Sequence, residues 1–220
     1  MGKVQAIIFD FGQVLTDHEV TKHLLASYDR QLGWPEGTLH ERLYRGEWWR
    51  KVSLAEISET EYFQGAVGEV ASHLPLALDV LRSGCFALEP LRPEMVRLAR
   101  HLWRKYRLAL LSNATMSLRS QLIRWPHLFD LFEVVVISAE VGLRKPDRRV
   151  YELTLRRLQV EPAQAVFIDD KPSNVAGAQA VGIEGIVFRS PAQLRDELVQ
   201  RGLLEGHEGL DRSCTIPDRF

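Results

Sequence analysis

Cysteine is scarce in this sequence. Among 220 residues there are only two, Cys85 and Cys214, and they stand far apart in the chain. A distant pair forms no disulfide framework and lacks the close spacing of a metal site. The sequence therefore predicts two free thiols in a reducing compartment, and we expect a cytoplasmic protein.

Long apolar runs and an excess of one charge are missing too. No stretch approaches the ~20 apolar residues that span a bilayer, and the apolar run near the N-terminus is too short for a signal peptide. Lys and Arg total 28 against 29 for Asp and Glu, which leaves a net charge of -1. No basic block rises above this mixed background. We therefore expect neither a membrane nor a nucleic acid as a partner.

The sequence has instead short apolar runs that end abruptly in polar residues. These runs are residues 4–9, 108–111, 132–137, 165–168 and 185–188. Continuous runs of this length are typical of strands that are buried on both faces of a parallel sheet. Helical patterns accompany the later runs, at residues 93–106, 146–158, 172–181 and 193–202. This alternation predicts an α/β fold with a doubly wound parallel sheet.

Residues 16–86 break the alternation, because a simple crossover between strands needs far fewer residues. They are helix-like, with breaks expected at residues 33–35, residues 65–68 and Pro75. We interpret this segment as a small helical cap domain, inserted into a core domain of residues 1–15 and 87–204. Residues 205–220 are polar and unpatterned, and we expect them to form a C-terminal tail.

Polar side chains that could take part in catalysis or in ligand binding follow the apolar runs. They are Asp10, Ser112, Asn113, Lys145, Asp169 and Asp170. Ligands of open parallel sheets bind beyond the carboxyl ends of the strands, so these side chains are expected to converge. Considered alone, an aspartate in the position of Asp10 is a helix cap or turn residue about as often as it is catalytic. A lysine such as Lys145 is usually a solvated surface residue. The Asp169–Asp170 pair is more specific, because adjacent carboxylates repel each other unless a cation lies nearby.

Four segments in this order resemble the haloacid dehalogenase superfamily, in its phosphatase-like branch with a helical cap. The segments are IIFDFGQVLTD with Asp10, LLSNAT with Ser112, GLRKPD with Lys145, and VFIDDKPSNVAGAQAVG with Asp169 and Asp170. The resemblance covers roughly residues 4–188. It implies a Rossmann-like core with strand order 5-4-1-2-3 and a hydrolase that acts on a small phosphorylated molecule.

The resemblance also implies a catalytic role for Asp10, Ser112 and Lys145. Asp10 would attack phosphorus to give an aspartyl-phosphate, which water then cleaves. Ser112, Asn113 and Lys145 would bind the phosphoryl oxygens, and Lys145 would also hold the Asp10 carboxylate. Asn174 would either orient Lys145 or the metal shell, or simply cap its helix.

A metal site is implied as well, with Mg²⁺ as the cofactor. Its ligands would be Asp10, the backbone carbonyl of Gly12, and the acidic pair Asp169 and Asp170. Of that pair, Asp170 is favoured as the direct ligand, with Asp169 as a ligand through water or as an orienting group. Mg²⁺ prefers oxygen ligands, and it would let an anionic carboxylate approach an anionic phosphate.

Gly12 departs from the pattern, because most phosphatases of this family carry a second aspartate there as the general acid and base. Such help contributes ~10²–10⁴-fold in rate. We hypothesise that His18 or Asp17 partly replaces it, against the simpler interpretation of a polar loop. Two further alternatives stay open: a haloacid dehalogenase-type enzyme, against which Asp169–Asp170 argues, and a non-catalytic protein that binds phosphate and Mg²⁺.

The predicted cap contains a segment rich in arginine and tryptophan, RLYRGEWWRK. Arg45 or Arg50 could bind a second anionic group, and Trp48 or Trp49 could stack on a sugar, with Arg45 and Trp49 as the chosen substrate-binding candidates. The alternative is that both tryptophans pack in the core of the cap and the arginines are solvated. A sugar phosphate is one possible substrate, and the resemblance permits a monomer or a homodimer.

Overall fold

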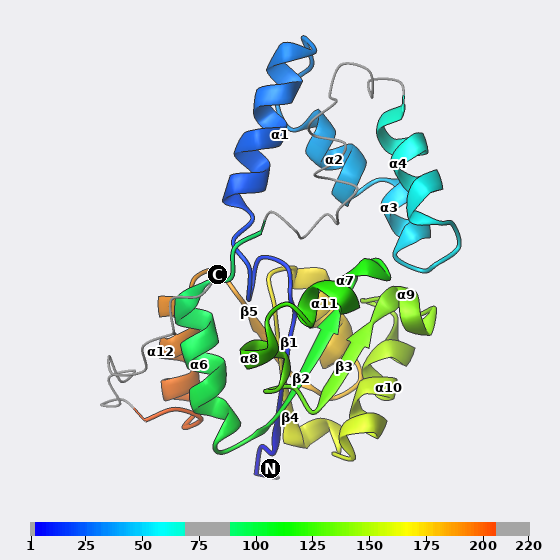
Figure 1. Cartoon of the computed structure of the whole chain (residues 1–220). Coiled ribbons are helices and arrows are strands. Elements are labelled where there is room, and N and C mark those ends of the chain that lie inside the picture. The colour runs from blue at the N-terminus through cyan, green and yellow to red at the C-terminus, as the bar shows by residue number, and fades with distance from the viewer. Residues whose placement is uncertain (1–2, 69–88, 206–220) are drawn as a thin grey trace.

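The computed structural model describes residues 3–68 and 89–205. Within them, five parallel strands form one sheet in the order β3-β2-β1-β4-β5 (Figure 1). The strands are β1 Ala6–Phe9, β2 Arg107–Ser112, β3 Val134–Ile137, β4 Ala165–Asp169 and β5 Glu184–Val187. This is the predicted order 5-4-1-2-3 counted from the opposite edge, so the predicted doubly wound fold is confirmed.

Helices cover both faces of the sheet (Figure 1). The core helices are α6 Pro93–Trp103, α7 Ser117–Leu122, α8 Pro126–Phe129, α9 Ser138–Val141, α10 Arg148–Leu158, α11 Pro172–Gln179 and α12 Pro191–Gln200, with a 3-10 turn at Pro162–Gln164. Ile7 and Phe9 of β1 pack in the same apolar cluster as α6 and α12. Ala6 and Ile8 pack in a second cluster with α10 and α11. Burial on both faces explains why the strands are continuously apolar.

Four further helices lie beyond the carboxyl edge of the sheet (Figure 1). They are α1 Glu19–Gln31, α2 Thr38–Tyr44, α3 Glu47–Val52 and α4 Glu59–Val67, called the cap helices below. Their shared apolar residues include Leu25, Leu43, Trp49 and Tyr62, which are all buried. The predicted helical character is therefore correct for residues 16–68, the described part of this segment. Residues 69–86 and 206–220 lie outside the described residues, and the domain boundaries and the C-terminal tail stay predictions.

The breaks predicted within the cap have mixed outcomes. The chain leaves α1 at Gln31, close to the expected break at residues 33–35. The expectation of a break from Gly65 was wrong, because α4 continues through it to Val67. A Cβ atom at Gly65 would lie 2.3 Å from Cε2 of Trp48, so this glycine permits close packing of the indole. Pro75 lies outside the described residues.

Two segments connect the cap helices to the core, and they run side by side. Thr16 and Leu91 form an antiparallel bridge, and the N–H of Asp17 donates to the carbonyl of Pro90 at 2.8 Å. The guanidinium of Arg92 donates to the carbonyl of Thr16 at 3.0 Å. The described parts of the chain include no helix with the length and apolar character needed to cross a bilayer.

Candidate active site

The sheet register brings the predicted residues to one edge. Phe9 of β1 pairs with Leu110 on one side and with Ile168 on the other. The next residue, Asp10, therefore lies between the ends of β2 and β4, and its N–H donates to the carbonyl of Ile168 at 2.9 Å. Ser112 and Asp169 end those two neighbouring strands. Segments far apart in the sequence thus deliver their polar ends to one place.

Lys145 lies at the centre of this edge and is 2% exposed. Its Nζ lies 2.8 Å from Oδ1 of Asp10 and 2.6 Å from Oδ2 of Asp169, and it donates to the carbonyl of Leu111 at 2.8 Å. Burial acts to lower the pKa of Lys145, but the charges of Asp10 and Asp169 outweigh burial and raise the pKa above its ordinary value. The lysine is therefore charged and holds the two carboxylates together.

Asp169 is fully buried and uses both carboxylate oxygens within the protein. Oδ1 accepts from the N–H of Lys171 at 2.8 Å and from Nδ2 of Asn174 at 2.9 Å, while Oδ2 accepts from Lys145. Asn174 therefore orients Asp169, rather than Lys145. Among the described residues, no other side chain donates to the carboxylate of Asp170, which lines the pocket. This difference favours Asp170 over Asp169 as a direct metal ligand.

The three carboxylates form a donor set that fits a divalent cation. Asp10, Asp169 and Asp170 each offer an oxygen, and these oxygens lie within 4.8 Å of one another. Burial raises the pKa of Asp10 to about 7, since the charges of Asp169 and Asp170 add to burial and only Lys145 opposes it. Burial and the charge of Asp169 also raise the pKa of Asp170. Crowded carboxylate oxygens of this kind suit Mg²⁺.

Ser112 and Asn113 follow β2 and differ in what they do. Asn113 donates from Nδ2 to the carbonyl of Lys145 at 2.9 Å and accepts from its N–H at 2.8 Å. Asn113 thus fixes the backbone that carries the buried lysine, and the predicted contact with phosphate stays a prediction. Within the described chain the hydroxyl of Ser112 has no hydrogen-bond partner, and Ser112 lines the pocket, so it can meet a ligand.

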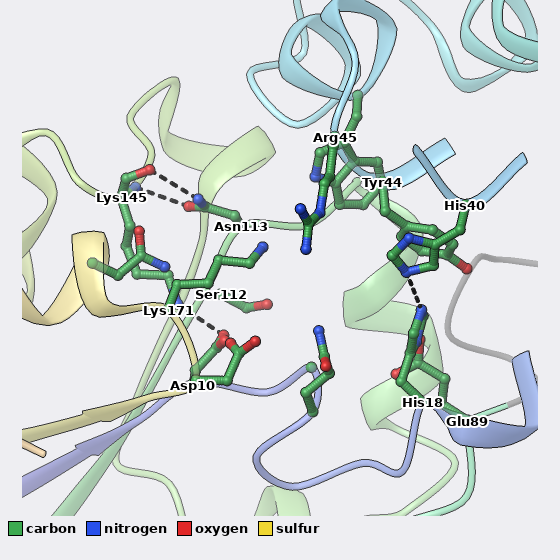
Figure 2. Close-up of a pocket in the computed structure, with 15 residues that line it drawn as sticks. Asp10, His18, His40, Tyr44, Arg45, Glu89, Ser112, Asn113, Lys145 and Lys171 are labelled. Atoms are coloured by element: carbon green, nitrogen blue, oxygen red, sulfur yellow. Dashed lines mark hydrogen bonds and ion pairs between the residues drawn. The ribbon is translucent and has the colours of Figure 1, made fainter. Parts of the chain in front are cut away.

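A pocket joins these residues to the cap helices (Figure 2). It is lined by Asp10, Gly12, Gln13, His18, His40, Tyr44, Arg45, Trp49, Glu89, Ser112, Asn113, Lys145, Asp170, Lys171 and Asn174. Every predicted catalytic residue and every predicted substrate-binding residue is among them. Of the four predicted metal ligands, Asp169 is the exception, since it lies behind the lining under Lys145 and Asn174.

The cap residues singled out in the sequence have unequal positions. The Arg45 side chain is 62% exposed, lies 3.7 Å from Glu41 and extends over the pocket (Figure 2). Trp49 is 4% exposed and packs against Tyr44 and Tyr62 at ring distances of 5.7 and 5.9 Å. Trp49 therefore packs mainly in the core of the cap, which is the alternative considered for the tryptophans. Arg50 is paired with glutamates and does not line this pocket.

Several lining residues were missed by sequence reasoning. They are Gln13, His40, Tyr44, Glu89 and Lys171. Lys171 directly follows the acidic pair, so its position carried a signal. Glu89 and His40 carried none, because their partners come from segments 71 and 22 residues away.

His18 and Asp17, the two candidates to replace the general acid that Gly12 lacks, lie in different surroundings. His18 is buried and lines the pocket. Asp17 instead lies 3.3 Å from the guanidinium of Arg92 and accepts from the N–H of Glu19 at 3.1 Å. Asp17 is not among the residues that line the pocket, so its predicted participation loses support.

The family model of the haloacid dehalogenase-like hydrolases matches residues 4–182. The chain therefore belongs to this family of hydrolases. It is 31% identical over 205 residues to acyl-CoA dehydrogenase family member 10 of Mus musculus, which covers 88% of this chain and 19% of that protein. It is 35% identical over 99 residues to phosphoserine phosphatase of Thermus thermophilus, which covers 44% of this chain and 40% of that protein. The chain thus spans less than half the length of these relatives.

Solved structures agree on the fold. A predicted family hydrolase from Porphyromonas gingivalis superposes with a TM-score of 0.66 at 22% identity, covering 93% of this chain and all of the other. A family enzyme from Bacteroides thetaiotaomicron, in complex with magnesium and inorganic phosphate, superposes with a TM-score of 0.64 at 19% identity, covering 84% and 94%.

Proposed function

We propose that this chain is a Mg²⁺-dependent phosphatase that hydrolyses a phosphate monoester of a small metabolite through an aspartyl-phosphate on Asp10. The single observation that carries the proposal is the convergence of the carboxylates of Asp10, Asp169 and Asp170 beside one pocket, with Lys145 bridging Asp10 and Asp169. Relatives named as phosphatases support the same reaction class.

The ground-state site already restrains the nucleophile. Oδ1 of Asp10 accepts from the N–H of Phe11 at 2.7 Å and contacts Lys145, which leaves Oδ2 to attack. Asp10, the Gly12 carbonyl and Asp170 would hold Mg²⁺, with Asp169 behind them. When bound, Mg²⁺ supplies the positive charge that offsets repulsion between the carboxylate and the phosphate.

The remaining residues bind and orient the phosphoryl group. The Ser112 hydroxyl donates to one phosphoryl oxygen, and the charge of Lys145 offsets developing negative charge. Asn113 keeps Lys145 in place through its two backbone hydrogen bonds. Arg45 and Lys171 add positive charge at the mouth of the pocket, which favours a small anionic substrate.

The test is phosphate release from p-nitrophenyl phosphate, with and without Mg²⁺. We expect release that needs Mg²⁺ and is lost in Asp10→Asn, with Asp17→Asn as a carboxylate control outside the pocket. Chloride release from 2-chloropropionate without metal would identify a dehalogenase instead. Mg²⁺ binding without turnover of any ester in a panel of sugar phosphates, nucleotides and phosphoglycolate would identify a binding protein.

A further inference from the structure

A second polar cluster lies across the pocket from Asp10. His18 Nδ1 hydrogen-bonds to the Glu89 carboxylate, and His18 Nε2 lies 3.1 Å from Nε2 of His40. Figure 2 shows the two imidazoles and Glu89 on one side of the pocket, facing Asp10 and Lys171 on the other. Both histidines line the pocket, and the mechanism above does not use either of them.

Burial and hydrogen bonding fix the orientation of this cluster. Glu89 is 2% exposed, and its other oxygen accepts from the Thr16 hydroxyl at 2.6 Å. A carboxylate only accepts, so the Nδ1 of His18 carries a hydrogen that points at Glu89. The Nε2 of His18 is therefore the atom that faces His40, and Tyr44 closes one side with its ring 4.8 Å from that of His18.

The two Nε2 atoms can form a hydrogen bond only if one of them carries a hydrogen and the other accepts it. Burial is the main cause that lowers the pKa of His40 to about 4, and the charges of His18, Arg45, Lys22 and Lys171 lower it further. His40 is therefore neutral near pH 7. Of the two histidines, His18 is the one that contacts the buried Glu89 carboxylate.

The proposed reaction needs a proton donor for the leaving group. Gly12 supplies no carboxylate beside the nucleophile, and Asp17 is turned to Arg92. A leaving alcohol of low acidity needs protonation as its bond to phosphorus breaks. Histidine is the side chain that most often transfers protons near neutral pH.

We propose that the His18–His40 pair, charged against Glu89, is the general acid and then the general base of this enzyme. The inference rests on the proposed phosphatase function. As Asp10 bonds to phosphorus, the ester P–O bond breaks with its electron pair on the alcohol oxygen, which takes the extra proton of the pair. Water then attacks the aspartyl-phosphate, gives its proton back to the pair, and releases phosphate and the Asp10 carboxylate.

Glu89 also ties the two connections between cap and core together, through Thr16 and His18. A purely structural role of the cluster would therefore slow the hydrolysis of every ester alike. Proton donation to the leaving group would instead slow esters of weakly acidic alcohols selectively, because nitrophenolate leaves without a proton.

The experiment compares kcat/KM for p-nitrophenyl phosphate and for a simple alkyl phosphate, because kcat/KM reports the first irreversible step. In His18→Gln we expect the alkyl ester to slow by ~10²–10⁴-fold and the nitrophenyl ester by less than about tenfold. His40→Gln, at a half-buried position, provides the same comparison if His18→Gln fails to fold. His23→Gln, an exposed histidine on α1, is the matched control and should change neither rate.

Two further variants separate positioning from chemistry. Glu89→Gln should move the alkaline limb of the alkyl-ester pH profile to lower pH, because the charged pair loses its carboxylate. Gly12→Asp added to His18→Gln should recover part of the alkyl-ester rate by restoring an acid beside Asp10. Equal losses on both esters, or no loss on either, would overturn the inference even if Asp10→Asn abolishes turnover. A wild-type protein inactive on both esters, and on the panel of sugar phosphates, nucleotides and phosphoglycolate, would instead refute the phosphatase function itself.

Discussion

At the scale of single residues, Lys145 compensates two buried carboxylates at once. Its side chain is 1% exposed, and those of Asp10 and Asp169 are 11% and 0% exposed. Removing one partner of such a group leaves uncompensated charge in a poorly solvated place. The lysine is therefore required for folding as well as being the proposed contact for phosphate.

Lys145→Met should lower the free energy of unfolding by about 3–5 kcal/mol at pH 8, as measured by urea denaturation. The pKa of Asp10 is raised to about 7 by burial even beside the lysine. Without the lysine that pKa rises further, so at pH 5.5 Asp10 is neutral and the loss should be smaller. Lys22→Met removes an exposed partner of Glu19 and should cost at most about 1 kcal/mol. An equal loss at pH 8 and pH 5.5 would contradict this account.

The raised pKa of Asp10 also makes Mg²⁺ binding dependent on pH. Burial, followed by the charges of Asp169 and Asp170, favours the protonated acid below about pH 7. That proton must leave when the carboxylate binds the metal, so the apparent Kd should increase by up to about tenfold for each pH unit below 7. Calorimetry at pH 6 and pH 8, in two buffers of different ionisation enthalpy, measures both the Kd and the released proton. A Kd that is the same at both pH values would rule out Asp10 as a ligand.

At the scale of elements, α11 must approach the segment that carries Lys145 closely. A Cβ atom at Gly177 would lie 2.9 Å from both Cβ and the carbonyl oxygen of Pro146. Asn174, one turn earlier on the same helix, holds Asp169. Displacement of α11 would therefore reach the carboxylates directly.

Gly177→Ala should destabilise the fold by about 1–3 kcal/mol, because α11 has no room for the methyl group. It should also lower phosphate release by moving Asn174 away from Asp169. Gly68→Ala is the control, since its nearest contact is Gln64 Cγ at 3.6 Å and its φ of -57° is ordinary for alanine. Urea midpoints and kcat for both variants make the comparison, and equal behaviour of the two would contradict the packing argument.

Elements of the core were predictable because their cause is local. The run that forms β4 is apolar at every position, as burial on both faces requires, and the proline at the start of α11 marks a first helical turn. The motif residues Asp10 and Ser112 were predictable from the same pattern, since each follows or ends such a strand.

Other features depend on contacts that no local pattern encodes. Glycine is common at helix breaks, but Gly65 lies inside α4 because the indole of Trp48 packs over it. His40 lies on the short helix α2, and only the fold places it beside His18. Glu89 becomes a partner of His18 because the two segments that connect the cap helices to the core run side by side.

At the scale of the whole molecule, the cap helices contact the core away from the two connections as well. The N–H of Ser117, the first residue of α7, donates to Oε1 of Glu59 at the start of α4 with a distance of 3.0 Å. A carboxylate at a helix N-terminus is favoured by the partial positive charge of the unpaired N–H groups. This contact holds the cap helices over the pocket edge formed after β2.

Glu59→Ala should therefore weaken closure of the cap helices over the substrate without unfolding either part. A partly exposed hydrogen bond to a charged group contributes about 1 kcal/mol, so kcat/KM should fall about fivefold, mainly through a higher KM. The urea midpoint should change little, because Glu59 belongs to neither of the buried apolar clusters. Glu36→Ala, which removes a carboxylate 68% exposed and 3.6 Å from Arg30, is the matched control and should leave KM unchanged. If both variants had the same KM, the contact between α4 and α7 would have no part in holding the substrate, and the connections alone would place the cap.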